Sequence, residues 1–92
     1  MITVHAMITG RVQGVGYRAW TVDAARRHGV RGWVRNRTDR SVEVMLQGDA
    51  VKIEAMIEKC WQGPLLARVA DVRRREKQDV EIFNDFTSKS TL

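Results

Sequence analysis

The sequence has a single cysteine and a single proline, few aromatic residues and no long apolar run. One cysteine, Cys60, cannot form a disulfide within the chain, which is compatible with a reducing compartment. No apolar segment approaches the length of a membrane span, and the chain does not open on a basic segment followed by an apolar one. We therefore expect a cytoplasmic protein with no membrane partner.

Several kinds of catalytic machinery are also missing. The His, Cys, Asp and Glu residues form no cluster with the spacing of metal ligands. No serine or cysteine has an evident base partner, and no pair of carboxylates stands out for acid–base catalysis. We expect no metal and no cofactor, so an active site in this chain would depend on positioning and on charge stabilisation.

The composition is that of one small folded domain. The chain has 92 residues, 43% of them hydrophobic, which is near the lower size limit for a single unaided core. Its formal net charge of +5 attracts anions in general. The positive residues are scattered among aspartates and glutamates, so we interpret them as solvent-exposed surface. We expect residues 1–92 to form one domain and to be monomeric.

Hydrophobic periodicity and turn residues predict the order strand, helix, strand, strand, helix, strand. The expected ranges are a strand over 2–12, a helix over 18–28, strands over 30–35 and 41–47, a helix from Asp49 to Gly63-Pro64, a strand over 68–76 and a short strand at Phe86. This is the order of the ferredoxin-like split βαβ sandwich, an α+β fold. We expect an antiparallel sheet of four to five strands with two helices on one face.

The second helix has the clearest apolar stripe, and the fourth strand has an irregular one. Ile53, Met56, Ile57, Cys60 and Trp61 recur at helical spacing and are predicted to face the core. Cys60 is accordingly interpreted as a packing thiol, because a nucleophile needs a basic and partly exposed setting. In the segment 68–76 the apolar positions break the period of two, which allows a β-bulge there.

The stretch around which the chain is organised is 10–18, Gly-Arg-Val-Gln-Gly-Val-Gly-Tyr-Arg, between the first strand and the first helix. Gly14 and Gly16 let the backbone turn sharply. Successive N–H groups can then point into one concavity at the positive end of a helix, which favours a phosphate-sized anion. Arg18 adds a planar fork of donors. The stretch is neither a Walker A loop nor a dinucleotide fingerprint, and it predicts an anion cradle.

The full string 10–18 resembles the signature of the acylphosphatase family. A second family segment, Gly-Trp-Val-Arg-Asn over 32–36, follows at the expected distance, and the resemblance covers nearly the whole chain, thinning after about Lys77. It implies an enzyme that hydrolyses acyl phosphates, which are carboxylic–phosphoric mixed anhydrides, to a carboxylate and inorganic phosphate. The substrate would be a small molecule. Its carboxylate is stable unprotonated when it departs, so the reaction needs no general acid.

The resemblance also implies the roles of particular residues. Arg18 would bind the phosphate and Asn36 would position the attacking water, in a reaction without a metal. The backbone N–H groups of the loop would complete the phosphate site, with conformation mattering more than side chains: Gln13, Gly14, Val15, Gly16 and Tyr17. From the residues alone Asn36 would be interpreted as a turn residue; the paired motifs favour the catalytic role.

Two alternatives remain open. RNA-recognition motifs share the split βαβ plan, and the segment 31–34 is similar to the start of their RNP1 pattern. Asn36 and Arg37 depart from that pattern, and aromatic residues make up only 7% of the chain, so we expect no nucleic-acid partner. The same cradle could instead bind an anion without catalysis. The family's domain also leads larger carbamoyl-transfer proteins; a chain that ends at Leu92 favours the stand-alone enzyme.

Overall fold

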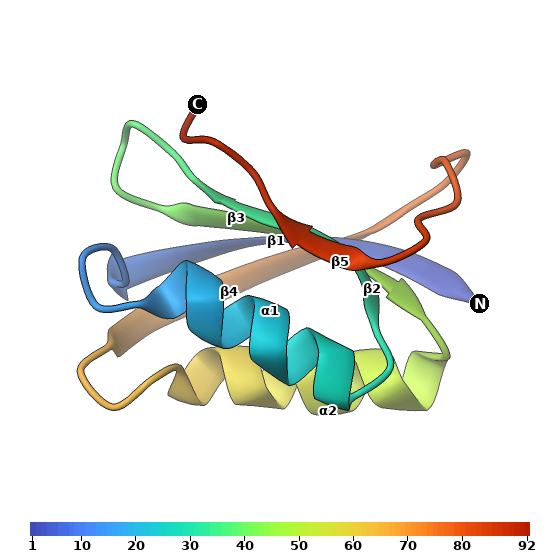
Figure 1. Cartoon of the computed structure of the whole chain (residues 1–92), viewed down its shortest axis with the longest axis horizontal. Coiled ribbons are helices and arrows are strands. Elements are labelled where there is room, and N and C mark those ends of the chain that lie inside the picture. The colour runs from blue at the N-terminus through green and yellow to red at the C-terminus, as the bar shows by residue number, and fades with distance from the viewer.

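Two helices cover one face of a five-stranded sheet in the computed structural model, which describes all residues 1–92 (Figure 1). The elements are β1 (Ile2–Arg11), α1 (Tyr17–Arg27), β2 (Arg31–Asn36), β3 (Val42–Gly48), α2 (Ala50–Gln62), β4 (Arg68–Lys77) and β5 (Phe86–Ser88). The predicted split βαβ order is confirmed. The first helix begins and ends one residue earlier than the sequence suggested.

The sheet is mixed, so the prediction of a purely antiparallel sheet is wrong at one edge. The strand order is β4-β1-β3-β2-β5, and β1, β3, β4 and β2 pair antiparallel where they meet. The short β5 instead runs parallel to β2, with Gly32 opposite Phe86. The direction follows from the path of the chain: β4 ends at the end of the sheet where β2 begins, so a segment that turns back along the sheet runs in the direction of β2 (Figure 1).

A bulge lies where β1 approaches its end. The register of β1 against β4 shifts between Thr9, which is opposite Asp71, and Gly10, which is opposite Val69. This leaves Ala70 as the extra residue, as the broken period of the sequence allowed. A bulge increases the local twist of a strand pair, and here it does so immediately before the loop that leads into α1.

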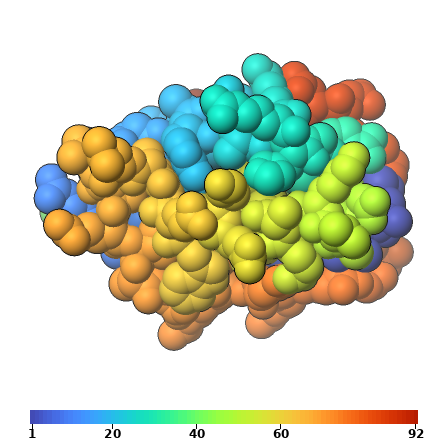
Figure 2. Space-filling model, turned by 90° about the horizontal axis from the view of Figure 1, so that it is seen from below, coloured from blue at the N-terminus to red at the C-terminus, as the bar shows by residue number.

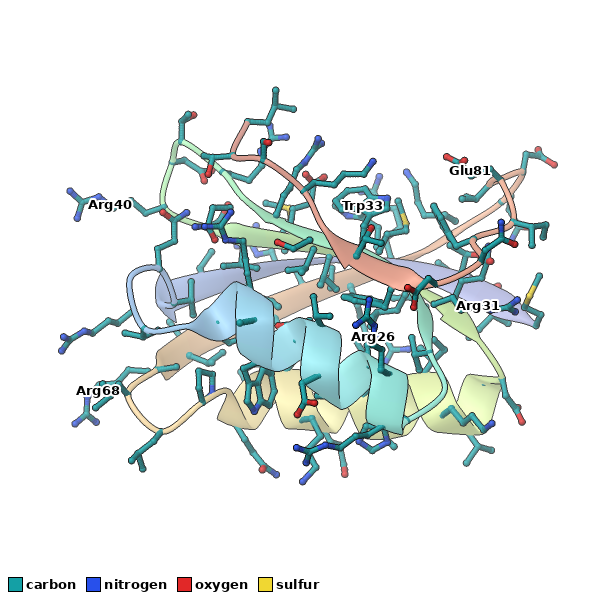
Figure 3. The ribbon with its side chains drawn as sticks, viewed as in Figure 1. Arg26, Arg31, Trp33, Arg40, Arg68 and Glu81 are labelled. Carbon is teal, nitrogen blue, oxygen red and sulfur yellow. The ribbon has the colours of Figure 1, made fainter.

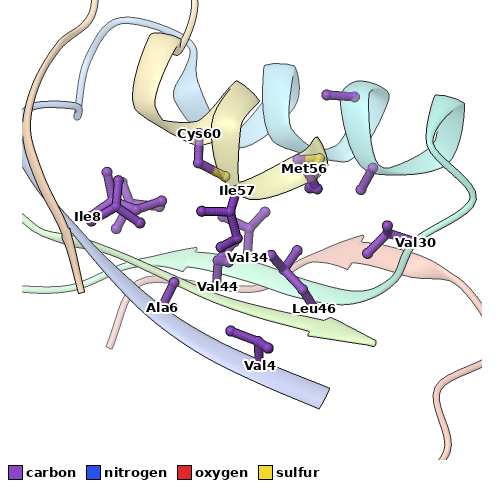
Figure 4. Close-up of a cluster of buried hydrophobic side chains, with 14 of the residues drawn as sticks. Val4, Ala6, Ile8, Val30, Val34, Val44, Leu46, Met56, Ile57 and Cys60 are labelled. Atoms are coloured by element: carbon purple, nitrogen blue, oxygen red, sulfur yellow. The ribbon is translucent and has the colours of Figure 1, made fainter. Parts of the chain in front are cut away.

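The core is the layer between the helices and the sheet (Figure 4). Alternate residues of β1 and β3, among them Ala6 and Leu46, meet Met56 and Cys60 of α2 there, and all of these are fully buried. Seen from the helix side, α1 and α2 lie next to each other over this layer (Figure 2). Neither helix has the length and apolar character that crossing a membrane requires.

The predicted apolar stripe of α2 is correct except at its last position. Ile53, Met56, Ile57 and Cys60 are buried, but Trp61 is 47% exposed. At 3.6 residues per turn, a residue eight positions after Ile53 lies about 80° further round the helix. That rotation carries Trp61 off the face that meets the sheet.

Candidate active site

Three segments that are distant in sequence meet at one end of the sheet: the loop 12–16, the β2–β3 turn 37–41 and the C-terminal tail (Figure 1). The Gln13 side chain donates from Nε2 to the carbonyls of Arg37 and Ser41, both at 2.8 Å. The N–H of Thr38 donates to the Leu92 carbonyl at 3.0 Å. The end of β1, the start of α1 and the end of β2 are thereby held together.

The loop holds its backbone in a conformation that suits glycine. Gly14 and Gly16 have φ values of 73° and 77°, in the left-handed region. A Cβ atom at either position would meet no other atom within 4 Å, so the requirement for glycine is conformational rather than steric. The Gly16 carbonyl accepts the first helical hydrogen bond, from the N–H of Trp20 at 3.0 Å.

The N–H groups along this loop have no partners within the protein. None of the backbone N–H groups of residues 13–16 donates to a protein acceptor. The N–H groups of the first turn of α1, from Tyr17 to Ala19, precede the first helical hydrogen bond and are unpaired for the same geometric reason. The loop and the helix start thus present a continuous series of unused donors.

The electrostatic setting of these donors favours an anion. The start of α1 has no side-chain cap and no acidic residue in its first turn, so nothing compensates the positive end of the helix dipole. Arg18 lies in that turn and contacts no carboxylate. The one hydrogen bond of its guanidinium is a long one, from Nη1 to the Lys89 carbonyl at 3.5 Å. These unpaired donors lie in the stretch for which the sequence predicted an anion cradle, and we call the N–H groups of residues 13–18 and the Arg18 guanidinium the anion cradle.

The anion cradle opens into a cavity of about 420 Å³ that also contains Asn36. The lining residues are Val12, Gln13, Gly14, Gly16, Tyr17, Arg18, Ala19, Asn36 and Ser88. The structure therefore brings together all but one of the site residues named from the sequence. The exception is Val15, whose half-buried side chain packs against the core instead.

Asn36 ends β2, directly opposite Val42 of β3. Its backbone carbonyl accepts a hydrogen bond from the N–H of Leu92 at 3.1 Å, which fixes the main chain. Its half-buried side-chain amide makes no hydrogen bond to the protein. The amide thus offers both a donor and an acceptor to whatever occupies the cavity.

Two side chains of the loop have structural roles that the sequence did not reveal. Gln13 ties the loop to the β2–β3 turn, and its partners lie 24 and 28 residues away, so no local pattern marks the contact. Tyr17 is buried and donates from its hydroxyl to the Cys60 carbonyl at 2.6 Å, which joins the start of α1 to the last turn of α2. Burial raises the pKa of the Tyr17 hydroxyl, which therefore stays protonated and able to donate.

A carboxylate supports the hairpin that carries Asn36. Glu43 of β3 accepts hydrogen bonds from Arg35 at 2.7 Å and Arg37 at 3.2 Å, and its other oxygen lies 2.7 Å from Nε2 of His5. Burial alone would raise the pKa of Glu43, but the hydrogen bonds from His5 and Arg35 outweigh it and hold the pKa below its usual value. Glu43 is therefore ionised at neutral pH and fixes the two arginines that flank Asn36.

The face of the sheet that the helices leave uncovered does not present a free aromatic ring. Trp33 is only 8% exposed. The Arg35 guanidinium lies 4.9 Å from the centroid of its ring and the Lys89 ammonium 4.8 Å from it, and Figure 3 shows where the ring lies. Because base stacking needs an accessible ring, the RNA-binding alternative is not favoured.

Comparison with known proteins gives the family. A sequence model described as Acylphosphatase matches residues 4–88. The chain belongs to the acylphosphatase family. An acylphosphatase of Anaeromyxobacter sp. (strain Fw109-5) is 54% identical over 69 residues, which are 75% of this chain and 74% of that protein. An acylphosphatase of Nitrosococcus oceani is 49% identical over 86 residues, 90% of this chain and 97% of that protein.

The fold agrees with the family. The crystal structure of an acylphosphatase from Bacillus subtilis superposes with a TM-score of 0.94 at 29% sequence identity, covering 97% of this chain and 99% of that one. The present chain thus has a ferredoxin-like fold and is an enzyme that hydrolyses acyl phosphates to a carboxylate and inorganic phosphate. The predicted fold and activity are both confirmed.

Proposed function

We propose that the hydrolysis takes place in the anion cradle, by in-line attack of a water held by Asn36 on a phosphate held by Arg18 and the N–H groups of residues 13–18. One observation carries this proposal. A series of N–H groups without protein partners and an arginine without a carboxylate partner share one cavity with a free asparagine amide.

In the reaction, the oxygen of the water forms a bond to phosphorus while the bond between phosphorus and the bridging oxygen breaks. The electron pair of that bond leaves with the acyl group as a carboxylate. The water gives its proton to a phosphoryl oxygen or to solvent, so the products are a carboxylate and inorganic phosphate, and the proton is either retained on the phosphate or released. No side chain has to act as an acid, because the carboxylate is a stable anion.

The role of the cradle is to stabilise charge. In phosphoryl transfer the three equatorial oxygens carry the charge of the transition state, so catalysis depends on positioning and on electrostatic stabilisation. The unpaired N–H groups and the Arg18 guanidinium line one cavity at the positive end of α1, so they can stabilise charge that develops on a phosphate bound there. Asn36 contributes orientation, since an amide can accept from one water and donate to the phosphate without being a base.

The experiment compares phosphate release from benzoyl phosphate, with EDTA present, by the native chain, Arg18→Ala, Asn36→Ala and Arg27→Ala. Arg27 is the matched control, because it lies on the same helix and has only an exposed ion pair with Asp23. Loss of Arg18 should lower kcat/KM about 10³-fold. Loss of Asn36 should lower kcat about 10²-fold with little change in KM, because it removes orientation rather than binding.

Particular results would contradict these assignments. If Arg18→Ala were as active as Arg27→Ala, the role of Arg18 in the anion cradle would be contradicted. If Asn36→Ala raised KM and left kcat unchanged, the assignment of water positioning to Asn36 would be contradicted. Hydrolysis in ¹⁸O-labelled water separates attack at phosphorus, which labels the phosphate, from attack at the carbonyl, which labels the carboxylate.

We propose further that residues 1–92 act as a single monomeric domain on a small-molecule substrate, in the cytoplasm and without a nucleic-acid or membrane partner. All the residues that line the cavity come from one chain, which supports a site that needs no second copy. Light scattering of the purified chain at working concentration measures the oligomeric state directly.

A further inference from the structure

A second hollow, of about 360 Å³, adjoins the cavity of the proposed active site. It is lined by Gly10, Arg11, Val12, Gln13, Gly14 and Arg40. The residues 12–14 line both spaces, so this stretch of the loop forms a common rim between them. The hollow is therefore within reach of any group that extends from a phosphate bound in the anion cradle.

Two unpaired guanidinium groups give this hollow its chemistry. Arg11 and Arg40 are exposed, and their guanidinium groups take part in no ion pair or hydrogen bond, whereas those of Arg27, Arg73 and Arg74 each contact a carboxylate. None of the six residues that line the hollow is acidic. An arginine without a carboxylate partner offers its full fork of donors to an external anion.

The turn that carries Arg40 holds it at the edge of this hollow. Arg40 has a φ of 77°, a left-handed conformation that is uncommon for a residue other than glycine. The adjacent Asp39 fixes the turn, since its Oδ1 accepts from the N–H of Ser41 at 3.0 Å and from the hydroxyl of Ser41 at 2.6 Å. In Figure 3 the Arg40 side chain extends outward beyond the end of the sheet where the loop 12–16 lies.

The acyl group of a bound substrate extends away from the phosphate. In-line attack places the leaving oxygen on the far side of phosphorus from the attacking water, so the acyl group does not occupy the place of the water. Asn36 and Arg18 line only the first cavity, whereas Arg11 and Arg40 line only the second. The second hollow adjoins the cradle across the common rim 12–14 and offers room for a group on the acyl chain.

We propose that this hollow is a subsite for a second anionic group on the acyl part of the substrate. The preferred substrates are acyl phosphates whose acyl chain carries a further negative charge, such as a carboxylate, which Arg11 and Arg40 bind. This inference rests on the proposed function of the anion cradle. It assigns a specificity role to two arginines that take no part in the chemistry.

The test compares acyl phosphates that differ only in the charge of the acyl group. The 3- and 4-carboxybenzoyl phosphates are the charged probes, and the 3- and 4-carbamoylbenzoyl phosphates are their neutral counterparts of the same shape. The enzymes are the native chain, Arg11→Gln, Arg40→Gln, the double variant and Arg68→Gln, with Arg18→Ala as the test of the anion cradle itself. Arg68 is the matched control, because it is exposed, unpaired and opposite Arg11 on β4, but lines neither space.

The readout is the ratio of kcat/KM for a carboxy probe to that for its carbamoyl counterpart. The double variant should lower this ratio about three- to tenfold, through a higher KM for the carboxy probe. Each single variant should lower the ratio by a smaller factor, and Arg68→Gln should change it little. Activity on the carbamoyl probes should be unchanged. Because exposed charges are screened, the ratio of the native chain should fall in high salt, and that of the double variant should not.

A ratio that falls equally in Arg68→Gln and in the double variant would overturn the subsite, because it would reflect the net charge of the surface alone. A ratio near one for both pairs of probes in the native chain would overturn it as well. Failure of the proposed function gives a different result. In that case, hydrolysis of the charged and of the neutral probes would be absent or would be unaffected by Arg18→Ala.

Discussion

Gln13 provides the sharpest test of how this site is held together. Its side chain donates two hydrogen bonds of 2.8 Å, to the carbonyls of Arg37 and Ser41, and so connects the anion cradle to the turn that follows Asn36. The substitution Gln13→Leu keeps the approximate size of the side chain and removes both donors. It leaves the backbone N–H groups of the loop in place.

The expected loss of stability follows from the two bonds. A hydrogen bond contributes about 0.5–1.5 kcal/mol net, so two partly buried ones correspond to about 1–3 kcal/mol. The catalytic effect is separate. When the loop and the turn are no longer fixed to each other, the phosphate and the attacking water lose their relative placement, and we expect kcat to fall about tenfold or more.

The control is Gln47→Leu, because the Gln47 side chain also makes several bonds: to Thr3 at 3.1 Å, to the Glu81 carbonyl at 2.9 Å and from the N–H of Phe83 at 2.9 Å. Gln47 lies near the opposite end of β3, opposite Thr3 of β1. Urea unfolding should show that both variants are destabilised, whereas steady-state kinetics should show a fall in kcat for Gln13→Leu alone. Equal kinetic effects, or a destabilised Gln13→Leu with native kcat, would refute the reasoning.

Two further predictions concern the stability of the loop and of the hairpin beside it. Gly16→Ala should cost about 1–2 kcal/mol in thermal unfolding, because φ is 77° there, and Gly16→Asn should cost less, since asparagine tolerates this conformation better. Equal losses in the two variants would contradict a conformational origin. The pKa of Glu43 is lower in the folded protein than its usual value of 4.5 in an unfolded chain. The contacts of Glu43 therefore stabilise the fold fully above pH 4.5, and this contribution is lost as the pH falls through the lower pKa of the folded protein. Urea unfolding between pH 7 and 3 should therefore show a loss of stability in acid that is smaller in Glu43→Gln, and an identical acid loss in both proteins would exclude this role.

Much of the fold could be predicted because its signals are local. Alternating and helical periodicity gave the order of the elements, and the glycines of the loop 10–18 marked the turn into α1. The parallel pairing of β5 could not be predicted in this way, because the three residues from Phe86 to Ser88 carry no information about the direction of their partner. That direction is set by where β4 ends, which is a property of the assembled sheet.

In the candidate site, too, the local features could be predicted and the long-range contacts could not. The donors of the anion cradle belong to one continuous stretch, and Arg18 and Asn36 lie in recognisable motifs, so the sequence indicated them. The contacts of the Gln13 side chain and the pairing of Glu43 with His5 join residues that only the folded sheet brings together. Trp61 was misplaced for a different reason, since a stripe read over eight residues ignores the rotation of the helix.

The position of β1 inside the sheet, between β3 and β4, has a consequence for how the chain folds. One neighbour of β1 is β3, but the other is β4, from Arg68 to Lys77, which follows α2 and is therefore synthesised well after β1 and β3. Pairing segments so far apart requires closing a long loop, which slows folding relative to hairpins between neighbouring strands. Until β4 arrives, one side of β1 retains unpaired backbone groups along ten residues, a template for pairing with other chains. The interval between synthesis of β1 and synthesis of β4 is thus when the nascent chain is most exposed to aggregation, and delayed release of residues 68–77 should lower the soluble yield.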